Sequence, residues 1–259
     1  MWTKSLWDEI PWDQIQAGER EGWVFHDDFI NMPNLSVDAD LHKYAAFIDT
    51  NATITQGVAN EFGEVVLLSD AGENIGANLT TGGQTGGLSK FILQATAVPH
   101  TIAFEARMKT STLVGSVYIG FSEEGLGTTE GILSNTGTLS DKNHIGFLVP
   151  EADPDGLDFV YNKESGAAPT TMIADIHTMV ADEYVKVGFI YNYKNAAAKQ
   201  IKVYKNGVRN ATFVTKALID NTTNFPGGEE MGLAMAFKNV TDIKNFTVDW
   251  WRAALVVNS

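Results

Sequence analysis

The sequence predicts an all-β protein, a two-layer antiparallel β-sandwich that follows a short N-terminal arm. From Val24 onward, short runs of alternating apolar and polar residues are separated by Gly, Asn, Asp and Thr, a pattern typical of antiparallel strands joined by turns. Segments with helical periodicity are nearly absent, which leaves almost no room for crossover helices. Of the 259 residues, 44% are hydrophobic and 19% charged, so the chain can bury a substantial core.

Residues 1–23 differ from the rest, and we expect them to form a Trp-rich docking arm. Pro11 breaks their helix-like apolar spacing, and four of the six tryptophans lie here when Trp23 is counted. This is too much apolar area for a freely solvated tail. The residues expected to dock on a partner are Trp2, Leu6, Trp7, Ile10, Trp12 and Ile15. Docking on a neighbouring subunit and folding back on the same domain both remain open.

Residues 24–259 are expected to form one sandwich domain. The expected strands are Val24 to Phe29, Glu64 to Leu68, Phe91 to Gln94, Thr101 to Lys109, Gly115 to Ser122, His144 to Val149, Leu157 to Asn162, Thr171 to His177, Tyr184 to Tyr193, Gln200 to Tyr204, Arg209 to Leu218, Met231 to Ala236 and Asn245 to Val257. Two Gly- and Thr-rich stretches, 70–90 and 125–143, are expected to be long loops. Such loops are either binding elements or solvated spacers, and the sequence does not decide between them.

Alternation within the strands indicates which side chains face the core. The clearest core-facing sets are Ile102, Phe104, Ala106 and Met108; Val117, Ile119 and Phe121; and Val185, Val187, Phe189 and Tyr191. Between two of the later strands, Asn206-Gly207 supplies the positive φ angles of a two-residue hairpin turn.

The composition excludes several classes of function. The net charge of −14 opposes a polyphosphate backbone, so we expect no direct nucleic-acid partner. There is no cysteine, which excludes disulfides, thiolate metal sites and a cysteine nucleophile. Asp8 and Glu9 interrupt the apolar start of the chain, so no secretory leader is expected. No segment approaches the roughly 18 apolar residues of a membrane span, so no membrane partner is expected.

The second half of the chain carries an ordered set of features. They are GFLVPEADPDGLDFVYNK, ADEYVKVGFIYN, KQIKVYKNGV, FPGGEEMGLAMAFKN and FTVDWWRAALVV. In this order they resemble the concanavalin A-like sandwich of the lectin, laminin-G and glucanase type. Tyr184, Lys186 and Gly188 match one strand pattern of that family, and Val203, Tyr204, Asn206 and Gly207 match the next. The resemblance covers roughly residues 24–257 and implies a jelly-roll fold.

The start of the chain, SLWDEIPW followed by a Gly-containing break and VFHDDF, resembles openings of sandwich-type structural proteins of tailed phages. This resemblance implies a virion protein, assembled in the host cytoplasm, that decorates or cements the capsid. The implied partners are the major capsid protein, other virion proteins or a second copy of this chain. The alternative is a glycan- or receptor-binding module of a tail or fibre, and a glucanase-like hydrolase comes third.

Catalytic motifs are missing from the sequence. Retaining glucanases of this fold carry two carboxylates about 5 Å apart on one strand. The nearest approaches here are Glu61 with Glu64, at the wrong spacing, and Glu151 with Asp153 and Asp155, interrupted by proline and better explained as an acidic turn. Neither a serine-hydrolase elbow nor a phosphate-binding loop occurs, and the five histidines are scattered singly. We therefore expect no enzyme and no cofactor.

Two further ligands were weighed for this fold. A calcium ion would use Asp27, Asp28 and Asp249, where the first and last strands are expected to meet. Sugar binding would need an exposed aromatic platform. The aromatic residues on expected strands that could form such a platform also fit core positions. They are Tyr118, Phe147, Phe159, Tyr161, Tyr191 and Tyr193.

Overall fold

A computed structural model gives the fold of the chain. It describes residues 22–30, 44–57, 63–81, 91–93, 100–113, 115–123, 126, 131–166, 170–192, 200–240 and 244–257. The predicted docking residues Trp2, Leu6, Trp7, Ile10, Trp12 and Ile15 lie outside the described residues. Among the helices that are described, none has the length and apolar character needed to cross a membrane.

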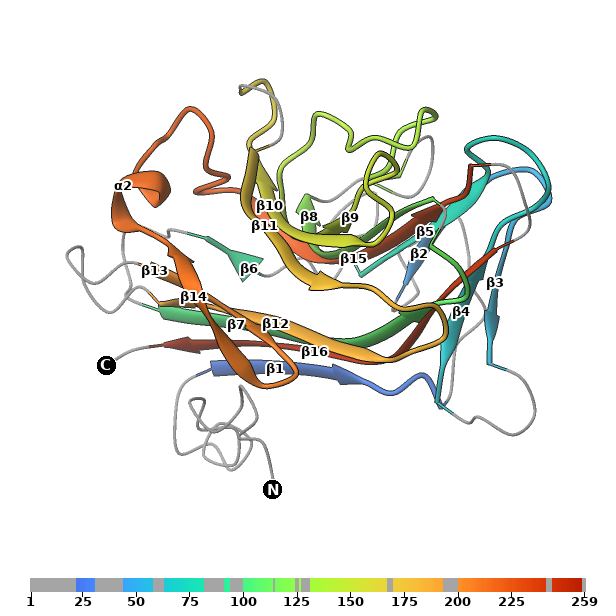
Figure 1. The fold of residues 1–259 in the computed structure, drawn as a ribbon. Helices are drawn as coiled ribbons and strands as arrows, with labels where there is room; N and C mark the ends of the chain where they lie inside the picture. Colours follow the sequence, from blue (N-terminus) through green and yellow to red (C-terminus); the bar gives the residue numbers. More distant parts are fainter. Residues whose placement is uncertain are drawn as a thin grey trace.

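Two antiparallel sheets pack face to face, as the sequence predicted (Figure 1). The first sheet has the order β14 (Val208–Val214), β13 (Gln200–Lys205), β12 (Val185–Asn192), β7 (His100–Thr110), β16 (Asn245–Val257), β4 (Val65–Leu68) and β3 (Thr53–Gln56), with β1 (Gly22–Asp27) beside β16. The second has the order β11 (Thr170–Thr178), β10 (Gly156–Asn162), β9 (His144–Val149), β8 (Ser116–Glu123), β15 (Glu230–Lys238), β5 (Gly76–Thr80) and β2 (Ala45–Ile48), with β6 (Phe91–Ile92) beside β15. A four-residue helix, α2 (Lys216–Ile219), follows β14.

The core between the sheets is built on phenylalanines from both layers. Phe104 and Phe189 come from the first sheet, and Phe121, Phe147 and Phe159 from the second; all five are fully buried. The Phe189 ring lies 5.4 Å from that of Phe159 and 5.7 Å from that of Phe121, both edge to face. The three predicted core-facing sets all belong to this core, which confirms the alternation.

The first and last strands are joined by a buried polar contact. Asp27, at the end of β1, accepts hydrogen bonds from the Tyr44 hydroxyl and from the backbone N–H of Phe29. The Trp251 indole in turn donates to the Tyr44 hydroxyl over 3.3 Å. Burial and the neighbouring Asp27 carboxylate raise the pKa of Tyr44 well above its usual value, so this hydroxyl stays protonated as a donor.

Two predictions about the strands are wrong, and two short strands were missed. Residues 70–90 are not one long loop, because they contain the buried strand β5 between β15 and β2. Its outward residues Asn78 and Thr80 are polar although they are buried. The sequence therefore resembles an exposed loop and did not predict this strand. The strand expected from Arg209 to Leu218 ends at Val214, and α2 follows. Strands β2 and β3, of four residues each, were not predicted.

The predicted hairpin between β13 and β14 is confirmed. Lys205 pairs with Val208, and the two residues between them, Asn206 and Gly207, have φ angles of 47° and 79°. This is the left-handed geometry of a two-residue turn, which suits Asn followed by Gly.

We expect Gly207→Ala to lower the free energy of unfolding by about 1 kcal/mol, because a Cβ is disfavoured at this φ. Urea denaturation followed by circular dichroism would measure the change. Asn206→Gly is the matched control, since it keeps the turn geometry accessible. A Gly207→Ala variant as stable as the wild type would contradict the assigned turn.

Candidate functional site

The outer face of the second sheet is the side that points away from the core. At its centre the residues are small or apolar: Ala234, Gly120, Gly146 and Val160 lie side by side on four neighbouring strands. The Tyr118 side chain lies across both glycines, and a Cβ on either glycine would come within 3.1 Å of its hydroxyl. The face therefore carries apolar and small residues in place of a row of polar side chains.

The chain segment before β9 covers part of this face. Leu126, Ile132 and Leu133 are buried there, at 2%, 0% and 1% exposure. They form one apolar cluster with Tyr118, Val160, Ala234 and Ala236. The described part of the loop expected at 125–143 is thus without a strand, as predicted, but it packs on the sheet and is not a solvated spacer.

His144 lies buried beneath this loop at the start of β9. Its Nδ1 is 2.8 Å from the Lys142 carbonyl, and its ring meets the Tyr118 ring edge to face at 5.7 Å. Its Nε2 is buried and has no hydrogen-bond partner among the described residues. Burial lowers the pKa of His144 to about 4, so the ring is neutral near pH 7 and Nδ1 carries the proton that it donates to Lys142.

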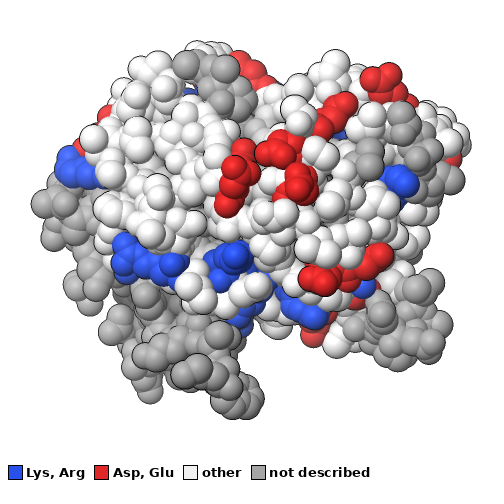
Figure 2. Space-filling view, viewed as in Figure 1, with Lys and Arg blue, Asp and Glu red and all other residues white. Residues whose placement is uncertain are grey.

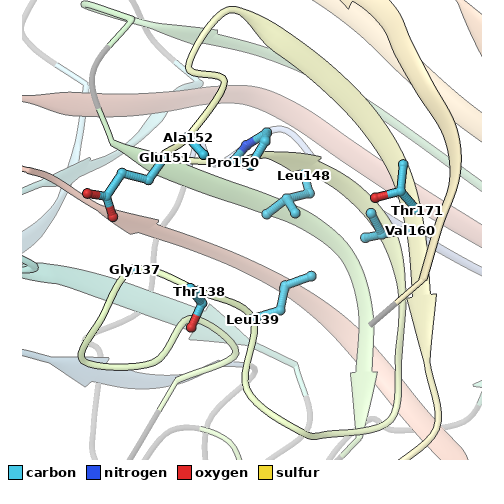
Figure 3. Close-up of a pocket in the computed structure, with 9 residues that line it drawn as sticks. All are labelled: Gly137, Thr138, Leu139, Leu148, Pro150, Glu151, Ala152, Val160 and Thr171. Carbon is cyan, nitrogen blue, oxygen red and sulfur yellow. The ribbon is translucent and has the colours of Figure 1, made fainter. Parts of the chain in front are cut away.

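Beyond the covered part, the outer face opens into a cleft of about 600 Å³ (Figure 3). Its lining residues come from the loop, from β9 and β10, from the turn between them and from edge strand β11. They are Gly137, Thr138, Leu139, Leu148, Pro150, Glu151, Ala152, Val160 and Thr171. Leu139, Leu148 and Val160 give the cleft an apolar floor, and none of the described residues that line it is aromatic.

Carboxylates gather around the turn between β9 and β10, where Glu151 lines the cleft. Figure 2 shows Asp and Glu side chains grouped on the face of the molecule seen in that view. Asp158 lies opposite Leu148 in the sheet, and its Oδ1 accepts a hydrogen bond from the backbone N–H of Asp175. Asp153 and Asp155 are exposed in the turn between β9 and β10, next to Glu151 of the cleft lining. We call Glu151, Asp153, Asp155, Asp158 and Asp175 the acidic rim.

Neighbouring rim charges disfavour the ionisation of Asp153 and Asp158. Desolvation, a hydrogen bond with Asp155 and the charges of Asp175, Asp155 and Asp158 raise the pKa of Asp153. Burial and the charge of Asp175 raise the pKa of Asp158, against the opposing effect of its backbone hydrogen bond. A cation beside the rim would relieve this repulsion.

The candidates for glucanase chemistry do not form a pair across the cleft. Asp153 and Asp155 lie in a turn, as the acidic-turn interpretation predicted. Glu61 is outside the described residues, and Glu64 contacts Lys109 over 3.6 Å on the first sheet. On β10 the outward positions next to the cleft are Asp158 and Val160, so this strand supplies one carboxylate to the outer face and not a pair.

The candidate calcium ligands are engaged by other groups. Asp27 accepts hydrogen bonds from the Tyr44 hydroxyl and the backbone N–H of Phe29. Asp28 accepts a hydrogen bond from the backbone N–H of Ile30, and Asp249 forms an ion pair with Arg107. Across the described ranges, no three His, Asp or Glu side chains are grouped so as to hold a metal ion.

The described aromatic candidates for a sugar platform are buried, Tyr118 on the outer face of the second sheet and the others in the core. Tyr118, Phe147, Phe159, Tyr161 and Tyr191 are at most 1% exposed. Tyr193 lies outside the described residues. Sequence reasoning missed the residues that do line the cleft, although Leu148 and Val160 gave a signal: both are apolar at positions that alternate with core-facing neighbours.

No family model and no curated protein sequence matches the chain. Solved structures of lectins and glucanases share its fold. Peanut lectin aligns with a TM-score of 0.58 and 12% identity, covering 92% of this chain and 99% of the lectin. The endo-1,3-β-glucanase of Streptomyces sioyaensis aligns with a TM-score of 0.57 and 11% identity, covering 90% of this chain and 96% of the glucanase. The carbohydrate recognition domain of Emp46p aligns with a TM-score of 0.54 and 11% identity, covering 88% of this chain and 98% of that domain.

The fold is therefore the concanavalin A-like jelly roll that the sequence resemblance implied. At identities of this size the likeness establishes the architecture alone.

Proposed function

We propose that this protein is a non-enzymatic structural protein of a tailed-phage particle, a decoration or cement protein attached to the capsid shell. The observation that carries the proposal is the covered outer face of the second sheet. Leu126, Ile132 and Leu133 are buried on this face, in one apolar cluster with side chains of the sheet. This supports a body that contacts other proteins and performs no hydrolysis.

The arm supplies the attachment in this proposal. The apolar side chains of residues 1–21 would be buried on the major capsid protein, another virion protein or a second copy, at about 25 cal/mol per Å² of apolar surface. The phage resemblance of the opening residues supports the same assignment. The acidic body would not compete with the shell for the packaged genome, since its charge repels phosphate.

Deleting residues 1–21 tests the proposal, because the deletion leaves β1 intact from Gly22 onward. We expect the shortened protein to fold but to be lost from purified particles, measured as copies per particle by quantitative gel or mass spectrometry. Restoring the arm with Trp2, Trp7 and Trp12 changed to Ser should not restore attachment. Full occupancy of particles by the shortened protein would contradict the proposal.

The second candidate function is a glycan- or receptor-binding module of a tail or fibre. The open cleft and the carbohydrate-recognition domains among the structural neighbours favour it. A glycan array probed with the purified protein should then give a signal that Val160→Lys removes. Glucanase activity is third, and release of reducing sugar from a β-glucan would promote it.

A further inference from the structure

The cleft on the second sheet combines an apolar floor with an acidic rim. The half-buried Leu139 and Leu148, with Val160 buried beside them, offer a surface for an apolar side chain, while Asp158 lies beside Leu148 at the edge of the floor. An occupant that fits both must therefore carry apolar and positively charged groups close together.

The acidic rim is not neutralised by the protein itself. Within the part of the chain that the structure describes, none of its five carboxylates forms an ion pair with Lys or Arg. The outer face of the first sheet is different. There the Glu105 carboxylate is held by Arg252 at 2.6 Å and by Lys186 at 3.4 Å, and Arg107 is paired with Asp249.

We propose that the cleft binds a basic segment of a partner protein, an extended stretch in which a Leu-like side chain rests on the apolar floor and neighbouring Lys or Arg side chains reach the acidic rim. The inference rests on the proposed function in so far as that function requires a protein partner. It adds a second contact, separate from the arm, and gives the chemistry of the partner's surface.

The charge of the occupant separates the alternatives. The chain's own residues 1–21 contain two basic and five acidic residues, so the acidic rim repels them. A neutral sugar could donate hydroxyl hydrogen bonds to the carboxylates, but it would not neutralise their charge, and none of the described lining residues offers an aromatic ring for it to stack on. A cationic segment relieves the repulsion within the rim and covers the floor at the same time.

Binding of the pentapeptide KLKLK, acetylated and amidated at its ends, to the full-length protein tests the inference. We expect saturable binding by fluorescence polarisation, with methyl chemical shifts moving at Leu139, Leu148 and Val160. Asp155→Asn with Asp158→Asn should weaken binding about fivefold, since two partly exposed charge contacts are lost. The matched control is Glu229→Gln with Glu230→Gln, which removes two charges from a different acidic pocket and should leave the affinity unchanged.

Equal binding of ELELE, shifts confined to another surface, or equal weakening by the control pair would each overturn the inference. So would a neutral glycan that displaces the peptide from the cleft. The outcome is independent of arm deletion: peptide binding by the protein that lacks residues 1–21, together with its full occupancy of particles, would uphold the cleft and contradict the proposed function.

Discussion

Acidification from about pH 6.5 to about pH 4 is expected to lower the free energy of unfolding by about 3 kcal/mol through the protonation of His144 alone. The folded protein holds this ring neutral, with a pKa lowered from 6.5 to about 4 by burial, whereas the unfolded chain takes up the proton near pH 6.5. Between these values the unfolded state binds more protons. Stability therefore rises with pH across this window and is lost as the pH falls through it.

Urea denaturation at pH 7 and pH 4.5 checks the prediction. The variant His144→Gln is the comparison, because its amide can still donate to the Lys142 carbonyl but does not titrate. Between pH 7 and pH 4.5 the free energy of unfolding should fall further in the wild type than in the variant, by most of the expected ~3 kcal/mol. Equal losses in the two proteins would show that His144 is accessible to water and that the loop does not seal the outer face.

Phe189→Ala is expected to lower the free energy of unfolding by about 3 to 5 kcal/mol, the usual cost of removing a buried phenylalanine ring. The ring is fully buried and meets rings from both sheets, including Phe104 at 5.8 Å and Phe147 at 6.4 Å. Its loss opens a cavity between the layers, and rigid strands on both sides limit how far the core can collapse.

Chemical denaturation at neutral pH measures this cost. Phe213→Ala is the matched control, because Phe213 is 40% exposed on edge strand β14 and its ring is not part of the core. The control should change stability by less than about 1 kcal/mol. Similar losses in the two variants would contradict the placement of the core between the sheets.

The sandwich could be predicted because its central strands are long and alternate cleanly. Strands β7, β8 and β12 each place at least three large apolar residues on one face, and the hairpin at Asn206-Gly207 follows from the two residues themselves. Strand β5 could not be predicted in this way. Its inward residues are only Ala77 and Leu79. Its outward residue Asn78 is buried by a loop that is distant in sequence, and the Asn78 side-chain oxygen accepts a hydrogen bond from the backbone N–H of Ile132 in that loop over 3.3 Å.

The cleft could be predicted only in part. The acidic turn at Asp153 and Asp155 was evident from the sequence, but its closeness to Leu139 and Val160 depends on how the loop before β9 folds back onto the sheet. No local pattern encodes that return. The apolar residues at outward positions of β9 and β10 were the available signal that something covers this face.

The covered face also distinguishes the proposed function from glucan hydrolysis. A glucanase needs two carboxylates facing an open groove. Here the outer face of the second sheet has Tyr118 lying over Gly120 and Gly146, with Leu133 of the loop in the same apolar cluster as the tyrosine. Contact with another protein is the role that such a surface and a Trp-rich arm support together.

Imaging of purified phage particles by electron cryomicroscopy, with density assigned to this chain, is the decisive measurement. We predict density shaped like the two-layer sandwich at regular positions on the outer surface of the capsid shell, joined to the shell through residues 1–21. Density found only on the tail or its fibres, or particles that lack this protein altogether, would contradict the assignment as a capsid decoration protein.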